Sequence, residues 1–237
     1  MGKDYLTKKV CMVETVKQVS QSAFQKNLRK AERHLSNACP RLGDWIRNQG
    51  PCELVPVTDR EPYESLVRAV AHQQLHGKAA ESILKRLTNR FPSQGFPTPL
   101  QLTRMRLTSY RACGFSLAKT EAIRGIARGI LAGQIPDGTA AVSMSNESLI
   151  ENLIQLKGIG KWTVEMFLIF TMGRLDVMPV DDFGVRAGLM HLYELKEMPK
   201  KDQFAIRTDA WSPYRSVGAW YLWRLADARK SSARRVD

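Results

Sequence analysis

Apolar residues recur at helical spacing along most of the chain, and the patterned stretches are separated by short segments rich in proline, glycine and polar residues. This spacing predicts an almost entirely α-helical protein. Residues 14–49 show helical patterns with basic faces, broken near Pro40 and Gly50. We find no repeats and no convincing strands, although the first fifty residues leave room for one.

A turn-rich linker over 51–61 separates this region from the rest of the chain. Thr98 and Pro99 close a loop at 91–99 as an expected N-cap and first helical residue. Ser145 or Asn146 is expected to cap a later helix. The helices expected in this middle part cover residues 62–75 and 78–90, both sides of Gly114, and 147–156.

Residues 156–171, LKGIGKWTVEMFLIFT, have the pattern of a hairpin between two helices. Gly158 and Gly160 allow a tight turn, and the apolar residues after Trp162 return at helical spacing. Such a turn leaves backbone N–H groups unpaired at the positive end of the second helix. The segment therefore predicts a phosphate-binding site, with Lys161 adding a cation beside it.

Asp181 and Asp182 precede a further helical pattern at 183–193. One of them is expected to be the N-cap of that helix, because aspartate is a favoured capping residue. A carboxylate close in sequence to a phosphate site suggests chemistry on nucleic acid. In the last helical pattern, 214–230, Trp220 and Trp223 lie one turn apart, a spacing more typical of core packing than of a pocket.

The bulk composition agrees with a nucleic-acid partner. The 237 residues carry a formal charge of +13, which favours a polyanion, although membrane surfaces also attract basic proteins. No apolar run reaches the roughly 18 residues of a membrane-spanning helix, and charges interrupt the N-terminus where a secretory signal would be apolar. The cysteines fit neither metal-ligand spacing nor a disulfide framework; they are Cys11, Cys39, Cys52 and Cys113.

The segment LKGIGKWTV … DVMPVDDFGVRAG resembles the helix-hairpin-helix DNA glycosylases, and within them the alkylation-repair branch that removes 3-methyladenine-type lesions. AHQQLHGKAA at 71–80 and SPYRSVGAWYLW at 212–223 are similar to two further family segments. The resemblance covers about residues 60–227. It implies an all-α fold of two helical subdomains with an active-site cleft between them, and a monofunctional enzyme that flips an alkylated purine out of duplex DNA and hydrolyses its N-glycosidic bond.

The resemblance also implies roles for single residues. Asp182 matches the catalytic aspartate, which stabilises a cationic sugar. Trp162 and Trp223 match walls that stack on the flipped base. Trp162 occupies the position at which lyase relatives carry a lysine, so no Schiff base is expected. His76, or alternatively Leu75, is expected to fill the gap left by the flipped base, and the implied DNA contacts are Gly158, Gly160, Lys161, Thr163, Gln73 and His76.

Cofactor, partner and domain expectations follow. The resemblance implies a Na⁺ or K⁺ ion on the backbone carbonyls of Ile154, Leu156 and Ile159, no other cofactor, and no iron–sulfur cluster, because no cysteine follows Cys113. We expect an intracellular, DNA-associated monomer, in the cytoplasm and nucleoid of a bacterium or the nucleus of a eukaryote, with damaged duplex DNA as its partner. The expected domains are an N-terminal helical extension at 1–50, a glycosylase domain at 51–227 and a disordered basic tail at 228–237.

Two alternatives remain at the level of the sequence. The first is a glycosylase of the same fold that acts on an oxidised, deaminated or mismatched base; the tryptophan at 162 argues against a lyase but leaves the base open. The second is a helix-hairpin-helix module that binds DNA without catalysis. Asp182 argues against this module, because binding alone would not favour a carboxylate facing a phosphate-rich ligand.

Overall fold

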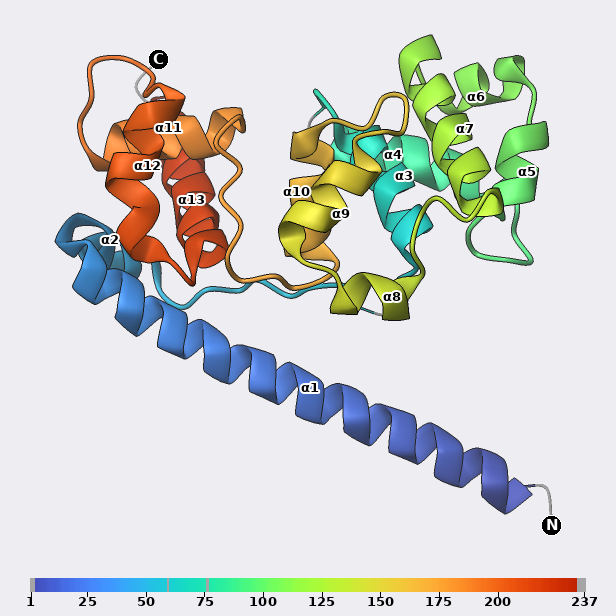
Figure 1. Cartoon of the computed structure of the whole chain (residues 1–237), viewed down its shortest axis with the longest axis horizontal. Helices are drawn as coiled ribbons and strands as arrows, with labels where there is room; N and C mark the ends of the chain where they lie inside the picture. The colour runs from blue at the N-terminus through green and yellow to red at the C-terminus, as the bar shows by residue number, and fades with distance from the viewer. Residues whose placement is uncertain (1–2, 59, 76, 234–237) are drawn as a thin grey trace. The chain divides into compact units, whose positions relative to one another are not determined.

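The computed structural model describes the backbone of residues 3–58, 60–75 and 77–233, and side chains from residue 21 to residue 231 within those ranges. All regular structure in these ranges is helical, which confirms the predicted all-α class (Figure 1). The helices are α1 (Lys3–Ala38), α2 (Pro40–Gln49), α3 (Pro62–His72), α4 (Gly77–Thr88), α5 (Pro99–Arg104), α6 (Leu107–Cys113), α7 (Leu117–Leu131), α8 (Gly138–Ser143), α9 (Asn146–Leu153), α10 (Lys161–Phe170), α11 (Phe183–Leu192), α12 (Lys201–Thr208), the 3₁₀ turn η1 (Asp209–Trp211) and α13 (Arg215–Ala233).

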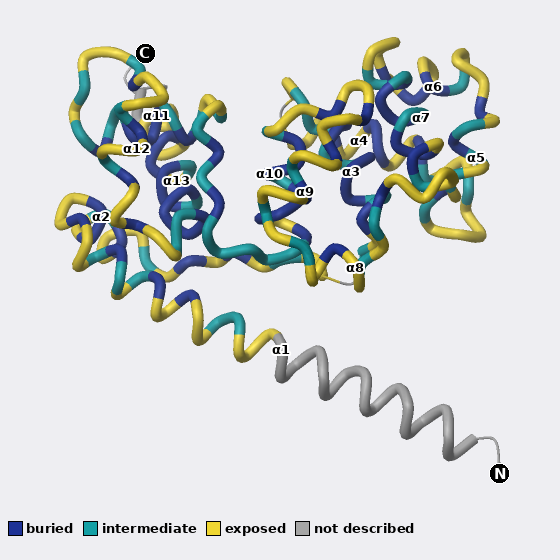
Figure 2. The backbone as a smooth tube through the Cα atoms, in the orientation of Figure 1, coloured by how far each residue is buried: buried dark blue, intermediate teal, exposed yellow. Residues whose placement is uncertain are grey.

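The chain divides into two compact units. One unit joins residues 1–54 to 180–237, and the other is continuous over 55–179. Figure 2 shows that the buried residues of each unit gather on its inner helices, α13 in the first and α3 and α7 in the second. The hairpin predicted from the sequence belongs to the second unit, and the acidic pair belongs to the first.

The first unit is built around α13. Tyr221 of this helix is fully buried, and its hydroxyl, which has a single proton to donate, lies 2.9 Å from the carbonyl of Gly50 and 3.1 Å from a carboxylate oxygen of Glu32. Trp45 in α2 donates from its indole nitrogen to the backbone carbonyl of Tyr221. These bonds tie the N-terminal helices to the C-terminal one. The structure thus differs from the predicted division, which sets residues 1–50 apart from the domain that contains α13.

The second unit is organised by α7. On one side α7 packs against α3, and on another against α5. The predicted start of α5 is confirmed, because the Thr98 hydroxyl accepts from the backbone of Gln101 while the Gln101 side chain accepts from Thr98 N, which completes a capping box. Ser145, one of the two predicted caps, begins α9 and accepts from Ser148 N.

Three parts of the chain are helical beyond what the sequence predicts. Two of these helices, α8 and α12, are short, and so few residues carry too little apolar periodicity to be recognised. The third part is the end of α13, which continues to Ala233, so residues 228–233 of the expected disordered tail are helical. Their alanine, arginine and lysine residues favour helix once the preceding turns are fixed by burial of Leu225 and Ala226.

Candidate functional site

The hairpin between α9 and α10 is closed by a glycine that no other residue can replace without strain. Gly158 has φ +84°, and a Cβ added there would lie 2.5 Å from the Cβ of Ala122 in α7. Short-range bonds from Leu156 N to Leu153 O and from Ile159 N to Leu156 O complete the turn. The hairpin is therefore a rigid connection that is packed directly onto α7.

Gly160, the N-cap of α10, has a different role. Its backbone is extended, and a Cβ added there would meet nothing within 4 Å. Within the described residues, the amides of Gly160 and Lys161 make no hydrogen bond. A helix N-terminus with open amides and no side chain in front of it is suited to bind a phosphate group.

Two lysines flank these amides, and both lie close to carboxylates. The Lys161 ammonium is 3.6 Å from Glu165, which is buried one turn further along α10. Lys157 lies 2.6 Å from Glu121 of α7, and this contact lowers the pKa of the Glu121 carboxyl. Both lysine side chains remain more than half exposed. They can therefore add positive charge at the hairpin while they stay connected to the helices beneath it.

Gln73 connects this hairpin to the end of α3. Its side-chain amide donates to the hydroxyl of Thr163 at 2.9 Å and, over a longer 3.4 Å, to the carbonyl of Gly158. Thr163 is 1% exposed, so the bond is formed inside the unit. The structure thus brings together three of the residues that the sequence analysis assigns to DNA contact, and the Gln73 amide is directed at the hairpin.

The turn that follows Gln73 is held from a second side. Lys119, at the start of α7, donates from its ammonium to the carbonyl of Ala71 at 2.8 Å, and burial lowers its pKa. Gln74 adopts φ +54°, a left-handed conformation that is uncommon for a residue other than glycine. His76 lies outside the described residues, so its expected role, and the alternative at Leu75, stay predictions.

Asp182 is the N-cap of α11, as expected for one member of the acidic pair. Its Oδ1 atom accepts from Val185 N at 2.9 Å. The same oxygen accepts a 2.7 Å hydrogen bond from the indole nitrogen of Trp223 in α13. Gly184 makes room for this contact, because a Cβ there would lie 2.7 Å from the Trp223 ring. The carboxylate is thereby fixed by one backbone donor and one aromatic donor.

Asp181 lies in a different environment from Asp182. It is exposed, and its carboxylate pairs with Lys201 of α12 at 2.8 Å. Exposed pairs of this kind contribute little stability. The two neighbouring aspartates therefore separate into a surface ion pair and an oriented, half-buried carboxylate, and only the second has the fixed geometry that catalysis needs.

The two tryptophans implied as stacking walls occupy different units. Trp162 is the second residue of α10 and is half-buried. Trp223 is also half-buried, and it is the ring that contacts Asp182. The neighbouring Trp220 instead lies under the Arg224 guanidinium, 5.5 Å from the ring centroid. Sequence reasoning missed the Trp223–Asp182 bond and the close approach that allows it; Gly184 and Gly188, four residues apart on α11, are the signal that could have indicated it.

Of the carbonyls implied as cation ligands, that of Leu156 accepts from Ile159 N at 3.0 Å, whereas those of Ile154 and Ile159 accept no hydrogen bond within the described part of the chain. The described residues contain no cluster of three or more His, Cys, Asp or Glu side chains suited to a metal ion. In the same ranges, no helix has the length and apolar character to cross a membrane.

Residues 67–213 match a protein family described as HhH-GPD superfamily base excision DNA repair protein. DNA-3-methyladenine glycosylase 1 of Schizosaccharomyces pombe is 43% identical over 210 residues, 86% of this chain and 91% of the relative. The alkylbase DNA glycosidase-like protein mag2 of the same organism is 36% identical, over 83% of this chain and 93% of its own. A solved structure of the Schizosaccharomyces pombe 3-methyladenine DNA glycosylase Mag1 in complex with abasic DNA superimposes with a TM-score of 0.77 over 82% of this chain and 95% of that one, at 43% identity.

Proposed function

The chain belongs to the HhH-GPD superfamily of base excision DNA repair proteins, and from this membership we propose that it is a DNA-3-methyladenine glycosylase, which flips alkylated purines out of duplex DNA and hydrolyses their N-glycosidic bond. The observation that carries the proposal is the oriented carboxylate of Asp182, at the start of α11 and bonded to Trp223. The names of the relatives at 43% and 36% identity support the same activity.

Asp182 acts by electrostatics. Departure of the base leaves a sugar with oxocarbenium character, and a carboxylate held close to it stabilises that positive charge and orients the attacking water. Two donors on Oδ1 fix the direction of the carboxylate before the reaction, so little reorganisation is needed when the charge develops. No amine takes part, because the position of the lyase lysine holds Trp162.

Alkylation at a ring nitrogen gives a purine a positive charge, which makes the base a good leaving group. An indole face attracts a cation by up to about 2 kcal/mol when both are desolvated. We therefore assign Trp162 and Trp223 to stacking on the extruded base. The hydrogen bond of Trp223 to Asp182 supports the second assignment, because it limits rotation of the ring.

We assign DNA backbone binding to the hairpin. The amides at Gly160 and Lys161 bind a backbone phosphate, and phosphate contacts position a protein without reading sequence. Carbonyl oxygens suit hard cations, and those of Ile154 and Ile159 accept no other bond in the described residues. With Leu156 they would hold a Na⁺ or K⁺ ion, which supplies positive charge beside the phosphate. A single chain contains all of these groups, so we propose that the enzyme acts as a monomer.

The test compares two isosteric variants of the acidic pair. Asp182→Asn retains an oxygen that can accept from Val185 and Trp223 but removes the charge, so excision of 3-methyladenine from methylated duplex DNA should fall by at least about a hundredfold in single turnover. Asp181→Asn, the matched control, should retain most activity. Release of free base is measured by chromatography, and DNA affinity is measured in parallel.

Three results would contradict the proposal. Release of free base from hypoxanthine DNA but not from methylated DNA by the wild-type chain would identify another lesion as the substrate. An equal loss of activity in Asp181→Asn and Asp182→Asn would remove the special role of the capping carboxylate. Borohydride trapping of a covalent adduct would show that an amine attacks the sugar.

A further inference from the structure

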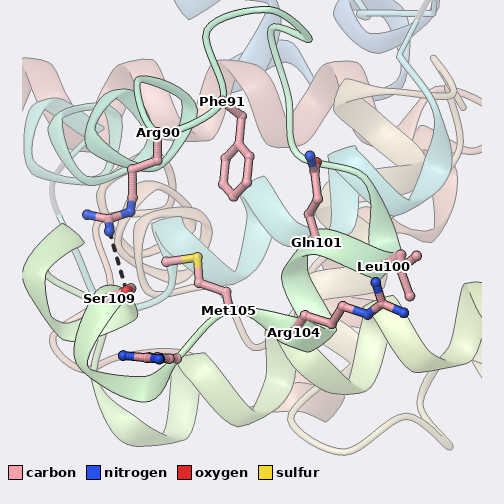
Figure 3. Close-up of a pocket in the computed structure, with 8 residues that line it drawn as sticks. Arg90, Phe91, Leu100, Gln101, Arg104, Met105 and Ser109 are labelled. Atoms are coloured by element: carbon pink, nitrogen blue, oxygen red, sulfur yellow. Dashed lines mark hydrogen bonds between the residues drawn. The ribbon is translucent and has the colours of Figure 1, made fainter.

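The continuous unit carries an open pocket that is lined by none of the hairpin residues. The loop after α4, helix α5 and the start of α6 enclose this pocket of about 400 Å³ (Figure 3). Its floor is apolar: the ring of Phe91 points into it beside Met105, which is 8% exposed. Its full lining is Arg90, Phe91, Leu100, Gln101, Arg104, Met105, Arg106 and Ser109.

The rim of the pocket is strongly basic. Arg90, Arg104 and Arg106 are exposed, and within the described residues none of them forms a salt bridge with a carboxylate. The surrounding sequence adds to this imbalance, because no Asp or Glu occurs between Glu81 and Glu121. The lysines and arginines of that stretch are Lys85, Arg86, Arg90, Arg104, Arg106, Arg111 and Lys119. Guanidinium groups that lie close together without a carboxylate partner repel one another, and binding of an anionic ligand would reduce this repulsion.

Arg90 donates to the hydroxyl of Ser109 at 3.3 Å across the pocket (Figure 3), and further bonds that do not involve Arg104 or Arg106 hold the walls in place. Tyr110 is fully buried and donates to the carbonyl of Leu102 at 2.7 Å, and burial raises the pKa of its hydroxyl. Arg124 of α7 donates to the carbonyl of Thr103 at 3.0 Å. Helix α5 is thus fixed at its C-terminal end by a buried tyrosine and a half-buried arginine, and at its start by the capping box at Thr98. A preformed pocket loses little entropy on binding.

Helix α7 separates this pocket from the hairpin. The hairpin packs on the side of α7 that carries Ala122 and Gly125, where a Cβ on Gly125 would lie 3.5 Å from the carbonyl of Lys157. Helix α5 contacts α7 on another side, through Arg124. The pocket is therefore distinct from the groups that we assign to phosphate binding.

From these observations we infer that the pocket binds an acidic peptide segment of a partner protein, with an apolar side chain on Phe91 and Met105 and flanking carboxylates on the three arginines. Arginine clusters recognise acidic motifs through paired, planar hydrogen bonds. The lining has arginine, methionine and phenylalanine but no lysine, which is the composition of a protein interface. The phosphates of a DNA duplex could pair with the arginines, but its backbone carries no apolar side chain that would fill the floor of a concave pocket.

The composition of the rim gives a second reason to expect an apolar anchor. Leu100 and Leu107 are 44% and 45% exposed, and Leu100 is part of the lining. Exposed leucines beside an apolar floor extend the area that an anchor residue can bury, and anchors in such pockets carry most of the affinity of an interface. Charge attracts the segment and sets its register, while the anchor slows its release.

The test begins with a displayed library of random peptides selected on the full-length protein, followed by fluorescence anisotropy with the enriched peptides. We expect an apolar residue flanked by Asp or Glu. Arg104→Glu with Arg106→Glu should weaken binding by about tenfold or more. The control, Lys26→Glu with Lys30→Glu, makes the same change of charge on exposed residues of α1 and should retain affinity within about twofold.

A second pair of variants tests the anchor without any change of charge. Leu100→Ser should weaken binding of the peptide. Leu131→Ser, which alters a leucine that is 56% exposed at the end of α7, should not. Base release from methylated DNA should be unchanged in all four variants, so a failure of this inference is distinguishable from a failure of the proposed activity. Enriched peptides that bind the Arg104/Arg106 variant as well as the wild type would overturn the inference, and so would displacement of the peptide by a single-stranded oligonucleotide.

Discussion

The indole nitrogen of Trp223 lies 2.7 Å from the carboxylate oxygen of Asp182 that also caps α11. Trp223→Phe keeps an aromatic face but removes this donor. A hydrogen bond to a charged group contributes about 1.5–3 kcal/mol, so single-turnover excision should fall by about tenfold to a hundredfold. The loss should be similar for 3-methyladenine and for neutral hypoxanthine, because the carboxylate acts on the sugar of both.

Trp223→Ala, by contrast, also removes the ring. This variant should lower the excision rate of the cationic lesion more than that of the neutral one, because it loses the cation–π attraction as well as the hydrogen-bond donor. An equal decrease in the excision rates of the two lesions in Trp223→Ala would show that the ring packs against the protein and does not stack on the base. Full activity of Trp223→Phe would show that the bond to Asp182 has no part in orienting the carboxylate.

Gly158 and Gly160 are predicted to be sensitive to substitution for different reasons. Gly160→Ala adds a methyl group that meets no protein atom, so the melting temperature should hold while affinity for duplex DNA falls by about tenfold, as if one hydrogen bond to a phosphate were lost. Gly158→Ala must strain its backbone and displace Ala122, and it should destabilise the fold by about 1–3 kcal/mol. Calorimetry and DNA titration of both variants check this. A stable Gly160→Ala protein with unchanged affinity would remove the amides of α10 from DNA binding.

At the level of helices, the end of α3 and the start of α10 are joined by the Gln73–Thr163 bond. We expect this bond to set the position of the turn after α3 relative to the hairpin. Gln73→Ala and Thr163→Val should each weaken binding to damaged DNA, and the double variant should be no worse than the poorer single variant, with a coupling of about 1 kcal/mol. Thr163→Ser, which keeps the hydroxyl, should behave as the wild type.

The comparison of the two single variants with the double variant also distinguishes two roles for Gln73. The sequence analysis assigns its amide to a contact with DNA, whereas in the structure the amide nitrogen donates to the hairpin. If the losses in the two single variants simply add, Gln73 acts on DNA independently of Thr163. Non-additive losses in DNA affinity would identify Gln73 as a positioning residue that acts through Thr163.

At the level of the whole molecule, the formal charge of +13 predicts binding that depends strongly on salt. Affinity for undamaged duplexes of different sequence should be nearly equal, and the logarithm of the association constant should fall linearly with the logarithm of salt concentration. Lys161→Gln should reduce this slope by about one, as expected for one lost phosphate contact. DNA titrations between low and physiological salt measure this slope. An unchanged slope in Lys161→Gln would show that Lys161 does not contact the DNA backbone.

Much of the fold and part of the candidate site follow from local rules. Helical periodicity, the glycines at 158 and 160, and capping by Thr98 depend on residues within a few positions of one another, and the structure has these features where the sequence predicts them. For the caps of α9 and α11 the sequence left two adjacent residues open, and the structure selects Ser145 and Asp182. Helix ends were harder to predict. Both α8 and α12 were missed and the end of α13 was placed too early, because short or exposed turns carry little apolar pattern.

The sequence by itself determined the all-α class, the hairpin and a helix capped by one of two adjacent aspartates, because each is decided by the conformational preferences of neighbouring residues. Only the tertiary structure decided which aspartate is oriented by Trp223, 41 residues away, and that the Gln73 amide meets Thr163, 90 residues away. It also decided that Arg90, Arg104 and Arg106 line one pocket. Such partnerships depend on which helices pack together, and that choice is made by burial of apolar faces over the whole unit.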